Sequence, residues 1–437
     1  MGRTVGKFFV QNFGCRATQA DGAALESSLV ARGLSQAGER SAADLVVLNT
    51  CTVTVSADED VRQTIRRVHR ENPEARILVT GCYAQRAPQE LAAMPGVEWV
   101  IGNSHKHAIP ELIALQPATA GAPYHGNVHV GDIFAQQAFL SAPVEEAGGD
   151  RTRPNLKIQD GCNNRCSFCI IPFVRGRSRG MPAEEVVAQV ARLALRYREV
   201  VLTGINLGRW GREPGSTLRL AGLVQRLLDK TAIERLRLSS VEPMDFSDDL
   251  LELMAANDRI APHIHAPLQS GSDRILRLMH RKYRPQHYAD RISRARRLMP
   301  DAAIGADVMV GFPGETNADF DESRQFIEQL PFTYLHVFTY SERPGTPAAE
   351  LPMAVPMAVR KERNRVLREL GERKNREFRQ RMVGRTLSAV TLHEPGTALT
   401  GNYLKVQLAA PRSSNRMADL QIGGLTRDGL REAEPVV

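Results

Sequence analysis

Three cysteines, Cys162, Cys166 and Cys169, lie within the short segment QDGCNNRCSFCIIP, and the whole chain of 437 residues has only six. A loop with C-x3-C-x2-C spacing can wrap around one compact inorganic group, and cysteine-rich loops of this kind hold iron–sulfur clusters. A structural zinc usually takes four ligands from paired knuckles, and the sequence offers no second C-x2-C pair. Three thiolates on a four-iron cluster leave one iron open, and that iron can bind a substrate.

The other three cysteines, Cys15, Cys51 and Cys82, each end an apolar, β-branched run. The runs read KFFVQNFGC, DLVVLNTC and RILVTGC, and each is followed by a helix-like pattern. Alternating strands and helices predict a parallel sheet with helices on its faces, and ligands gather at the carboxyl ends of such strands. A single cysteine at a strand end is more often a small buried apolar residue. Three in the same structural position favour a shared metal site.

The rest of the chain predicts a linker and two further domains. Residues 116–152 are rich in Ala, Gly and Pro, as a linker is. Between 153 and 383, six strand candidates alternate with helical stretches, which predicts a partial barrel whose working face lies at the loops after the strands. The candidates are NLKIQDGC, EVVLTGIN, RLRLSSVEP, HIHAPLQSGS, AIGADVMVGFPGE and YLHVFTYS. In 384–437, GRTLSAVTLHE and NYLKVQLAA alternate apolar and polar residues, which predicts a small all-β domain.

The chain is basic, with a formal net charge of +8 and a pI near 9.3. Part of the excess lies between residues 360 and 381, where ten Lys or Arg stand against four Glu. This segment reads either as a solvated helix laced with Glu–Arg pairs or as a face for a nucleic-acid backbone. Composition alone leaves both open.

The first residues, MGRTVGKFFVQNFGC, have neither the apolar segment nor the cleavage site of a secretory signal. No apolar run approaches the length that spans a bilayer. We therefore expect a soluble cytoplasmic protein without a membrane partner. In a reducing compartment, six cysteines favour metal or redox chemistry over a disulfide framework.

The C-x3-C-x2-C loop, with an aromatic before its last cysteine and a βα series after it, resembles the radical S-adenosylmethionine superfamily. The segments NFGC, NTCTVT and TGCYAQ resemble the amino-terminal domain of the methylthiotransferases in that superfamily. VGRTLSAV and NYLKVQL resemble their RNA-binding TRAM domain. The resemblance implies a parallel α/β cluster domain (1–115), a linker (116–152), a partial (βα)6 barrel ending in a basic helix (153–383) and a TRAM-like domain (384–437).

The same resemblance implies the chemistry. Cys162, Cys166 and Cys169 would hold one 4Fe-4S cluster that cleaves S-adenosylmethionine to a 5′-deoxyadenosyl radical. The three strand-end cysteines would hold a second 4Fe-4S cluster that presents sulfur, and a second S-adenosylmethionine would supply the methyl group. An electron-donor protein and a sulfur source are implied as partners, with tRNA as the substrate.

Four residues near the ends of barrel strands are candidates for binding S-adenosylmethionine. Phe168 can pack on the adenine or in the core, and Gly204 in LTGIN can bring backbone close to the methionine group or serve an ordinary turn. Glu242 in SSVEP and Gln269 in PLQSGS can reach ribose or carboxylate oxygens.

Three arginines, Arg175, Arg177 and Arg179, follow the cysteine loop in the segment VRGRSRG. They read either as a solvated loop or as side chains that grip a substrate phosphate or a cofactor carboxylate.

The methylthiotransferases divide by substrate. Several segments are most similar to the enzymes acting on N6-threonylcarbamoyladenosine of tRNA: NTCTVTVSADEDVRQTIRR, TGCYAQ, QDGCNNRCSFCIIP, RGRSR and RPGTPA. FGCRATQADG, around Cys15, departs from their pattern. The alternatives are tRNA isopentenyladenosine, a ribosomal-protein aspartate, or, in a different class, a non-enzymatic RNA-binding protein with structural metal sites.

Overall fold

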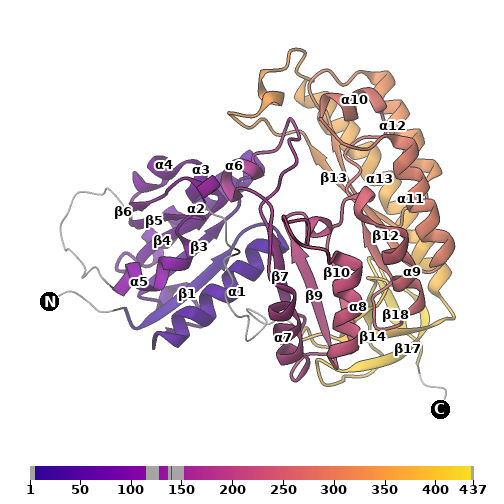
Figure 1. Cartoon of the computed structure of the whole chain (residues 1–437), viewed down its shortest axis with the longest axis horizontal. Coiled ribbons are helices and arrows are strands. Elements are labelled where there is room, and N and C mark those ends of the chain that lie inside the picture. Colours follow the sequence, from indigo (N-terminus) through magenta and orange to yellow (C-terminus); the bar gives the residue numbers. More distant parts are fainter. Residues whose placement is uncertain (1–4, 115–126, 136–138, 140–151, 435–437) are drawn as a thin grey trace.

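The computed structural model describes residues 5–114, 127–135, 139 and 152–434. It has three parts: a parallel α/β domain, a larger barrel-like α/β domain and a small β-barrel (Figure 1). In these ranges no helix combines the length and the apolarity needed to cross a membrane.

The first domain is a six-stranded parallel sheet in the order β2-β1-β3-β4-β5-β6. Both faces of β3 are buried, and alternate residues of this strand enter different cores. One core includes the apolar face of α2, and the other includes α1 and α5. The elements are β1 (Lys7–Asn12), α1 (Arg16–Ala31), β2 (Ser35–Gln36), β3 (Leu45–Thr50), α2 (Val55–Glu71), β4 (Arg76–Gly81), α3 (Cys82–Arg86), α4 (Pro88–Ala92), β5 (Val97–Gly102), α5 (Ile109–Ala114) and β6 (Asn127–His129).

The three strands predicted from the cysteine-ending runs are present as β1, β3 and β4. The sequence patterns did not single out β2, β5 or β6. Strand β6 lies within the range predicted as a linker, and it pairs in parallel with β5. The sheet of the first domain therefore continues beyond residue 115.

The second domain contains all six predicted strands in parallel series. They are β7 (Asn155–Asp160), β9 (Glu199–Gly204), β10 (Arg235–Leu238), β11 (His263–His265), β12 (Ala303–Val310) and β13 (Tyr334–Thr339). A single bridge between Leu236 and Ile260 links the sheet β10-β9-β7-β8 to the sheet β11-β12-β13. The short strand β8 (Arg179–Gly180) runs antiparallel to β7 at the edge. The partial barrel predicted for this domain is confirmed.

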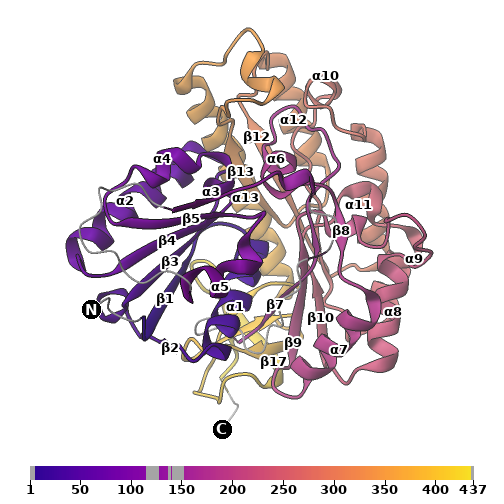
Figure 2. The same ribbon diagram turned by 60° about the vertical axis from the view of Figure 1, so that its left-hand side comes forward.

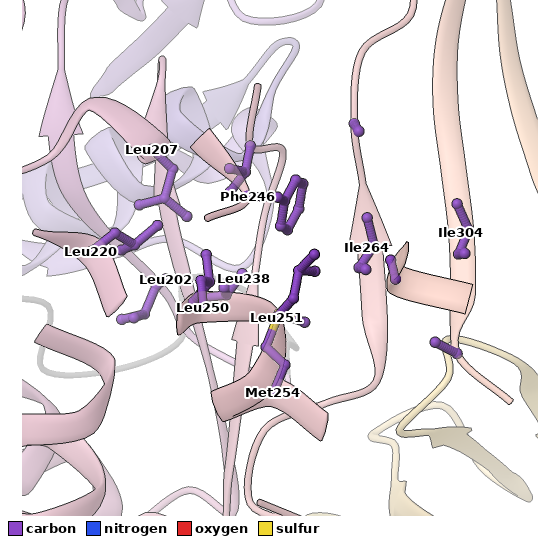
Figure 3. Close-up of a cluster of buried hydrophobic side chains, with 14 of the residues drawn as sticks. Leu202, Leu207, Leu220, Leu238, Phe246, Leu250, Leu251, Met254, Ile264 and Ile304 are labelled. Atoms are coloured by element: carbon purple, nitrogen blue, oxygen red, sulfur yellow. The ribbon is translucent and has the colours of Figure 1, made fainter. Parts of the chain in front are cut away.

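Helices cover the outside of this partial barrel. They are α7 (Ala183–Ala194), α8 (Leu220–Lys230), α9 (Asp248–Ala256), α10 (Asp273–Leu278), α11 (Pro285–Leu298), α12 (Asn317–Gln329) and α13 (Met357–Met382). The short helix α6 (Ile171–Arg175) packs instead against α3 of the first domain (Figure 2). Leu202, Leu250 and Ile264 belong to the apolar layer between strands and helices (Figure 3). The strand residues that alternate with this layer point the other way, into the barrel.

The third part is a closed five-stranded barrel in the order β14-β15-β16-β18-β17, which confirms the predicted small all-β domain. Its strands are β14 (Thr386–Thr391), β15 (Thr397–Thr400), β16 (Lys405–Gln407), β17 (Met417–Leu425) and β18 (Leu430–Glu432). It contacts residues at the beginnings of the larger domain's strands: Arg237 Nη1 donates to Gly401 O at 2.9 Å, and the rings of His263 and Tyr403 stack at 4.5 Å. It therefore closes the end opposite the loop after β7 (Figure 1).

A buried ion pair secures this junction. Glu199 and Arg237 are fully buried, and Arg237 Nε lies 2.7 Å from Glu199 Oε1. Burial alone would raise the pKa of Glu199, but the charges of Arg237 and Arg153 outweigh it and lower the pKa to about 2. Because the pKa falls on folding, the stabilisation is present above the ordinary value of 4.5 and is lost as the pH falls toward 2.

We expect Glu199→Gln to destabilise the fold by about 3–5 kcal/mol, because it leaves buried guanidinium groups without their counter-charge. Thermal unfolding followed by circular dichroism measures the effect. Glu234→Gln is the matched control, since Glu234 makes an exposed pair with Arg198, and such pairs contribute about 1 kcal/mol or less. Equal shifts in the two variants would contradict the prediction.

Candidate functional site

The strand-end cysteines meet at one edge of the first sheet, as the sequence predicted. Cys15 follows β1 and precedes α1, Cys51 follows β3, and Cys82 begins α3 directly after β4. Strands β1, β3 and β4 are neighbours in the sheet, so their carboxyl ends lie side by side.

Close packing and hydrogen bonds position these sulfurs. A Cβ added to Gly14 would lie 2.5 Å from the Cβ of Cys51, and Gly14 has a φ of +94°, so a residue with a side chain does not fit there. Cys82 Sγ accepts hydrogen bonds from Arg175 Nε at 3.3 Å and from Asn103 Nδ2 at 3.6 Å. Asn103 lies just after β5, so a fourth strand end and a residue of the second domain support the same sulfur.

The electrostatics of this triad favour a bound cation. Burial, together with the neighbouring sulfurs of Cys82 and Cys15, raises the pKa of the Cys51 thiol to about 12. Three thiolates together are stable only where positive charge compensates them, which coordinated metal provides.

The second triad lies on the loop between β7 and α6. Cys162 Sγ accepts from the backbone N–H of Asn164 at 3.4 Å and from Asn206 Nδ2 at 3.7 Å. Cys166 Sγ accepts from Arg281 Nη1 at 3.2 Å. Burial and the neighbouring sulfur of Cys166 together raise the pKa of Cys169 to about 12. The loop is thus a second site where thiolates need a cation.

The spacing of the sulfurs fits a cluster better than one ion. Among the described residues, three potential ligand atoms come within 4.8 Å of one another only in a histidine–aspartate set elsewhere in the barrel, and in neither cysteine triad. Ligands of one zinc ion lie close together because each is about 2.0–2.3 Å from it. In an iron–sulfur cube the thiolates bind different irons and stand further apart. The spacing is therefore compatible with a multi-iron cluster at each triad, and the presence of two clusters stays a prediction.

Comparisons with known proteins identify the family. The model described as "Uncharacterized protein family UPF0004" matches residues 7–102, and that of the radical SAM superfamily matches residues 156–327. The chain is 38% identical over 402 residues to threonylcarbamoyladenosine tRNA methylthiotransferase MtaB of Aquifex aeolicus, covering 92% of this chain and 96% of the relative. The chain belongs to the radical S-adenosylmethionine methylthiotransferase family. It is therefore a transferase that uses an iron–sulfur cluster and S-adenosylmethionine, and the non-enzymatic alternative is wrong.

Relatives named for two different tRNA nucleosides are similar to this chain. The MtaB protein of Bacillus subtilis is 38% identical over 379 residues, covering 86% of this chain and 83% of the relative. The tRNA-2-methylthio-N(6)-dimethylallyladenosine synthase of Pelotomaculum thermopropionicum is 35% identical over 390 residues, covering 87% and 85%. Overall identity thus separates the two substrate groups only narrowly.

Solved structures share the fold of this methylthiotransferase. The radical S-adenosylmethionine methyltransferase TsrM from Kitasatospora setae aligns with a TM-score of 0.56 at 16% identity, covering 79% of this chain and 77% of that one. The cobalamin-dependent radical enzyme OxsB aligns with a TM-score of 0.50 at 12% identity, covering 86% and 56%. At these identities the likeness concerns the fold alone.

The four residues predicted to bind S-adenosylmethionine lie around the second triad or at strand ends of the methylthiotransferase barrel. Phe168 is partly buried and packs edge-to-face on Phe312, with ring centroids 6.5 Å apart. Gly204 ends β9, and a Cβ there would lie 2.9 Å from the Cβ of Gln159. Core packing and close backbone approach are thus present, while contact with the cofactor stays a prediction.

Glu242 and Gln269 have unusual surroundings. Glu242 pairs with Arg281, which also donates to Cys166 Sγ. Gln269 has a φ of +64°, a strained conformation for a residue with a side chain, and such strain concentrates at functional sites. Sequence reasoning missed Arg281, which lies 115 residues from Cys166; only the cluster of basic residues in HRKYR marks it.

For two of the three arginines, the structure corrects both interpretations, because these two are neither solvated nor free to bind a phosphate or a cofactor carboxylate. Arg175 is only 1% exposed and pairs with Asp21 of the first domain and with Asp160, each at 3.0 Å. Arg179 is also buried and donates to backbone carbonyls of its own loop. Only Arg177 is exposed, and it lines a cavity of about 280 Å³ beside Cys162. The two buried guanidinium groups are bound by the protein itself, because carboxylates and carbonyls enclose them.

Proposed function

We propose that this enzyme adds a methylthio group to the C-2 carbon of N6-threonylcarbamoyladenosine, next to the anticodon in tRNA. Its relatives named as MtaB are 34–38% identical, and the motifs around Cys51, Cys82 and Cys162 are most similar to that group. A base beside the anticodon lies in a single-stranded loop, where it can be turned out and stacked.

The observation that carries the proposal is the contact between Cys82 of the first triad and the residues that directly follow the second triad. Cys82 of the first triad packs against Ile170, the residue after Cys169, and against Val174. Arg175, from the same short helix, donates to Cys82 Sγ. In this proposal, sulfur held at the first triad would therefore lie close to the radical formed at the second triad, as insertion of sulfur into a C–H bond requires.

In this proposal Cys162, Cys166 and Cys169 hold one 4Fe-4S cluster, and Cys15, Cys51 and Cys82 hold the second. When bound, the clusters and S-adenosylmethionine supply the hydrogen-abstracting radical, the sulfur and the methyl group. The protein orients these groups and excludes competing reactions.

The chain's own side chains stabilise the thiolates. Arg281 Nη1 donates to Cys166 Sγ at 3.2 Å, and its other nitrogen pairs with Glu242. Arg175 does the same for Cys82, with Asp21 and Asp160 holding its far end. Hydrogen bonds to cluster sulfurs and buried charges tune reduction potentials. Each triad thus has one cysteine whose sulfur accepts a hydrogen bond from a buried arginine, and that arginine lies on a segment other than the one that carries the cysteine.

For the tRNA, we propose three contact regions: Arg177, the exposed basic residues of α13 and the carboxy-terminal barrel as a TRAM-like RNA-binding domain. Several basic residues of α13 are already paired, such as Arg365 with Glu362 and Glu369. Others, including Lys361, Arg368, Arg376 and Arg381, are exposed. The same proposal includes the domain ranges given above, with the first domain extended to include β6. It also includes a cytoplasmic location, an electron-donor protein and a sulfur source.

The test is mass spectrometry of tRNA nucleosides from cells with and without the gene. We expect deletion to remove 2-methylthio-N6-threonylcarbamoyladenosine and to leave the unthiolated precursor accumulating. Reintroducing the gene should restore the product, which is the control. Loss of the isopentenyl derivative instead would assign the other tRNA substrate. Unchanged tRNA, with a methylthio group lost from a ribosomal protein, would overturn the tRNA substrate.

A further inference from the structure

Three side chains that the cysteine chemistry does not use come together inside the partial barrel: His265, Asp307 and His336. They lie on neighbouring strands β11, β12 and β13. Asp307 is paired in register with His336, and His265 with Gly305, two residues before Asp307. Residues two apart on a strand face the same side, so the three side chains share one face.

That face is the barrel interior. The residues alternating with these three, such as Ile264 and Ile304, belong to the apolar layer under the helices (Figure 3). The ring of His265 stacks on Tyr334 with centroids 5.9 Å apart. Tyr334 lies near Tyr403 of the carboxy-terminal barrel, with centroids 6.1 Å apart. The set thus lies one layer above the closed end of the barrel.

The distances suit ligands of one metal ion. His265 Nε2 and His336 Nδ1 each lie 3.3 Å from the same Asp307 oxygen, and all three ligand atoms are within 4.8 Å of one another. His336 Nδ1 and Asp307 Oδ1 are hydrogen-bonded at this distance, which is longer than the usual range of about 2.7–3.2 Å for nitrogen to oxygen. Ligands bound tetrahedrally at about 2.0–2.1 Å from zinc are about 3.4 Å apart.

The orientation of His265 supplies an independent indication. Its side chain is 8% exposed, and Nε2 is buried without a hydrogen bond of good geometry. The other ring nitrogen, Nδ1, lies 2.6 Å from Ser240 Oγ. When Nδ1–H donates to this hydroxyl, Nε2 presents a lone pair toward Asp307, where two lone pairs repel unless a cation lies between them. Metal-binding histidines are oriented by such a hydrogen bond from their other nitrogen.

The set also borders two residues predicted to bind S-adenosylmethionine, Glu242 and Gln269. Ser240 lies two residues before Glu242, and the backbone N–H of Gln269 donates to Asp307 O at 2.8 Å. Exposure rises from 8% at His265 through 24% at Asp307 to 53% at His336. An ion held here would have a buried side against the protein and an open side toward solvent.

We propose that His265, Asp307 and His336 bind a first-row divalent cation whose open positions receive the carboxylate and hydroxyl of the threonylcarbamoyl group. The substrate in this proposal rests on the proposed function, and the metal site rests on the geometry of the three side chains in the barrel. Two imidazoles and one carboxylate suit Zn²⁺, Mn²⁺ and Fe²⁺, and three protein ligands leave positions open. An isopentenyl group has no oxygen to offer, so the ion would select between the two modified adenosines.

The first experiment measures metal binding to the reconstituted full-length enzyme by equilibrium dialysis against Mn²⁺ or Zn²⁺ and elemental analysis. We expect the wild type to retain roughly one equivalent more than Asp307→Asn or His336→Gln. His336 is half-exposed, so its variant should fold normally. Ser240→Ala should weaken binding about 10–100-fold. Glu322→Gln, which removes an exposed carboxylate on α12, should bind as the wild type does.

The second experiment compares affinity for anticodon-loop RNA carrying either modified adenosine. Both proteins are assayed in buffer that contains the metal ion. Asp307→Asn should bind the threonylcarbamoyl RNA about tenfold more weakly than the wild type does, and it should bind the isopentenyl RNA with the affinity of the wild type. No difference in retained metal between wild type and both variants would overturn the site, even where nucleoside analysis supports the proposed function. Retained metal without an effect on RNA affinity would overturn its substrate role.

Discussion

Alanine at Cys162, Cys166 or Cys169 is expected to abolish reductive formation of 5′-deoxyadenosine from S-adenosylmethionine. The three sulfurs are the only cysteines on the loop after β7, and loss of one thiolate removes a ligand that the remaining two cannot replace. In contrast, the triple variant of Cys15, Cys51 and Cys82 should still form 5′-deoxyadenosine and make no methylthio nucleoside. Chromatography of nucleosides in anaerobic assays with reconstituted protein measures both products.

Iron analysis provides the control for these variants. Each set should lose the iron of one triad and keep that of the other, because the triads are held by separate domains and joined by packing, not by shared ligands. If the triple variant of Cys15, Cys51 and Cys82 still methylthiolates its substrate, these cysteines are not cluster ligands and are better interpreted as small apolar residues. Normal cleavage of S-adenosylmethionine by Cys162→Ala would remove the second triad from that reaction.

The cysteine sites were predictable because local patterns mark them. Each strand of the first triad is a β-branched run that stops at its cysteine, and parallel strands share one carboxyl edge. Strand β5, VEWVIG, has the same form but ends before Asn103, not a cysteine. The hydrogen bond from Asn103 to Cys82 Sγ could therefore not be predicted, because no cysteine marks the end of β5.

Contacts between distant segments were not predictable. The alternating arginines of VRGRSRG look alike in sequence, yet Arg175 and Arg179 are buried and Arg177 is exposed. Asp21, 154 residues away, determines this environment by pairing with Arg175. His265 and His336 likewise come together only because β11 and β13 flank β12.

Some arginines of the basic helix fit neither interpretation that composition left open, because they are buried. Arg363 is buried against Glu315, and Arg379 donates to carbonyls of the carboxy-terminal barrel. Arg363 holds the helix to its own domain, Arg379 joins it to the carboxy-terminal barrel, and neither is available to RNA. The remaining exposed cations are the ones for which salt-dependent RNA binding stays a prediction.

Arg175→Met is expected to have a large effect on both stability and sulfur transfer, whereas Arg177→Met, two residues away, affects only RNA binding. Arg175 bonds Asp21, Asp160 and Cys82 Sγ from a position that is 1% exposed. Burial would raise the pKa of Asp21, but the charges of Lys106, Lys157 and Arg175 hold it well below its ordinary value. Removing Arg175 withdraws one of those charges and a hydrogen bond to the triad.

Breaking a buried ion pair costs about 3–5 kcal/mol, so the thermal unfolding midpoint of Arg175→Met should fall clearly. Arg175→Met should retain more of its formation of 5′-deoxyadenosine than of its formation of methylthio product, because the lost hydrogen bond belongs to Cys82 and not to the loop after β7. Arg177→Met should unfold like the wild type and bind tRNA with a salt dependence weaker by about one phosphate contact. If the two variants lose stability equally, burial does not distinguish these arginines. If Arg175→Met keeps full methylthiolation, the link between the triads through this guanidinium has no part in sulfur transfer.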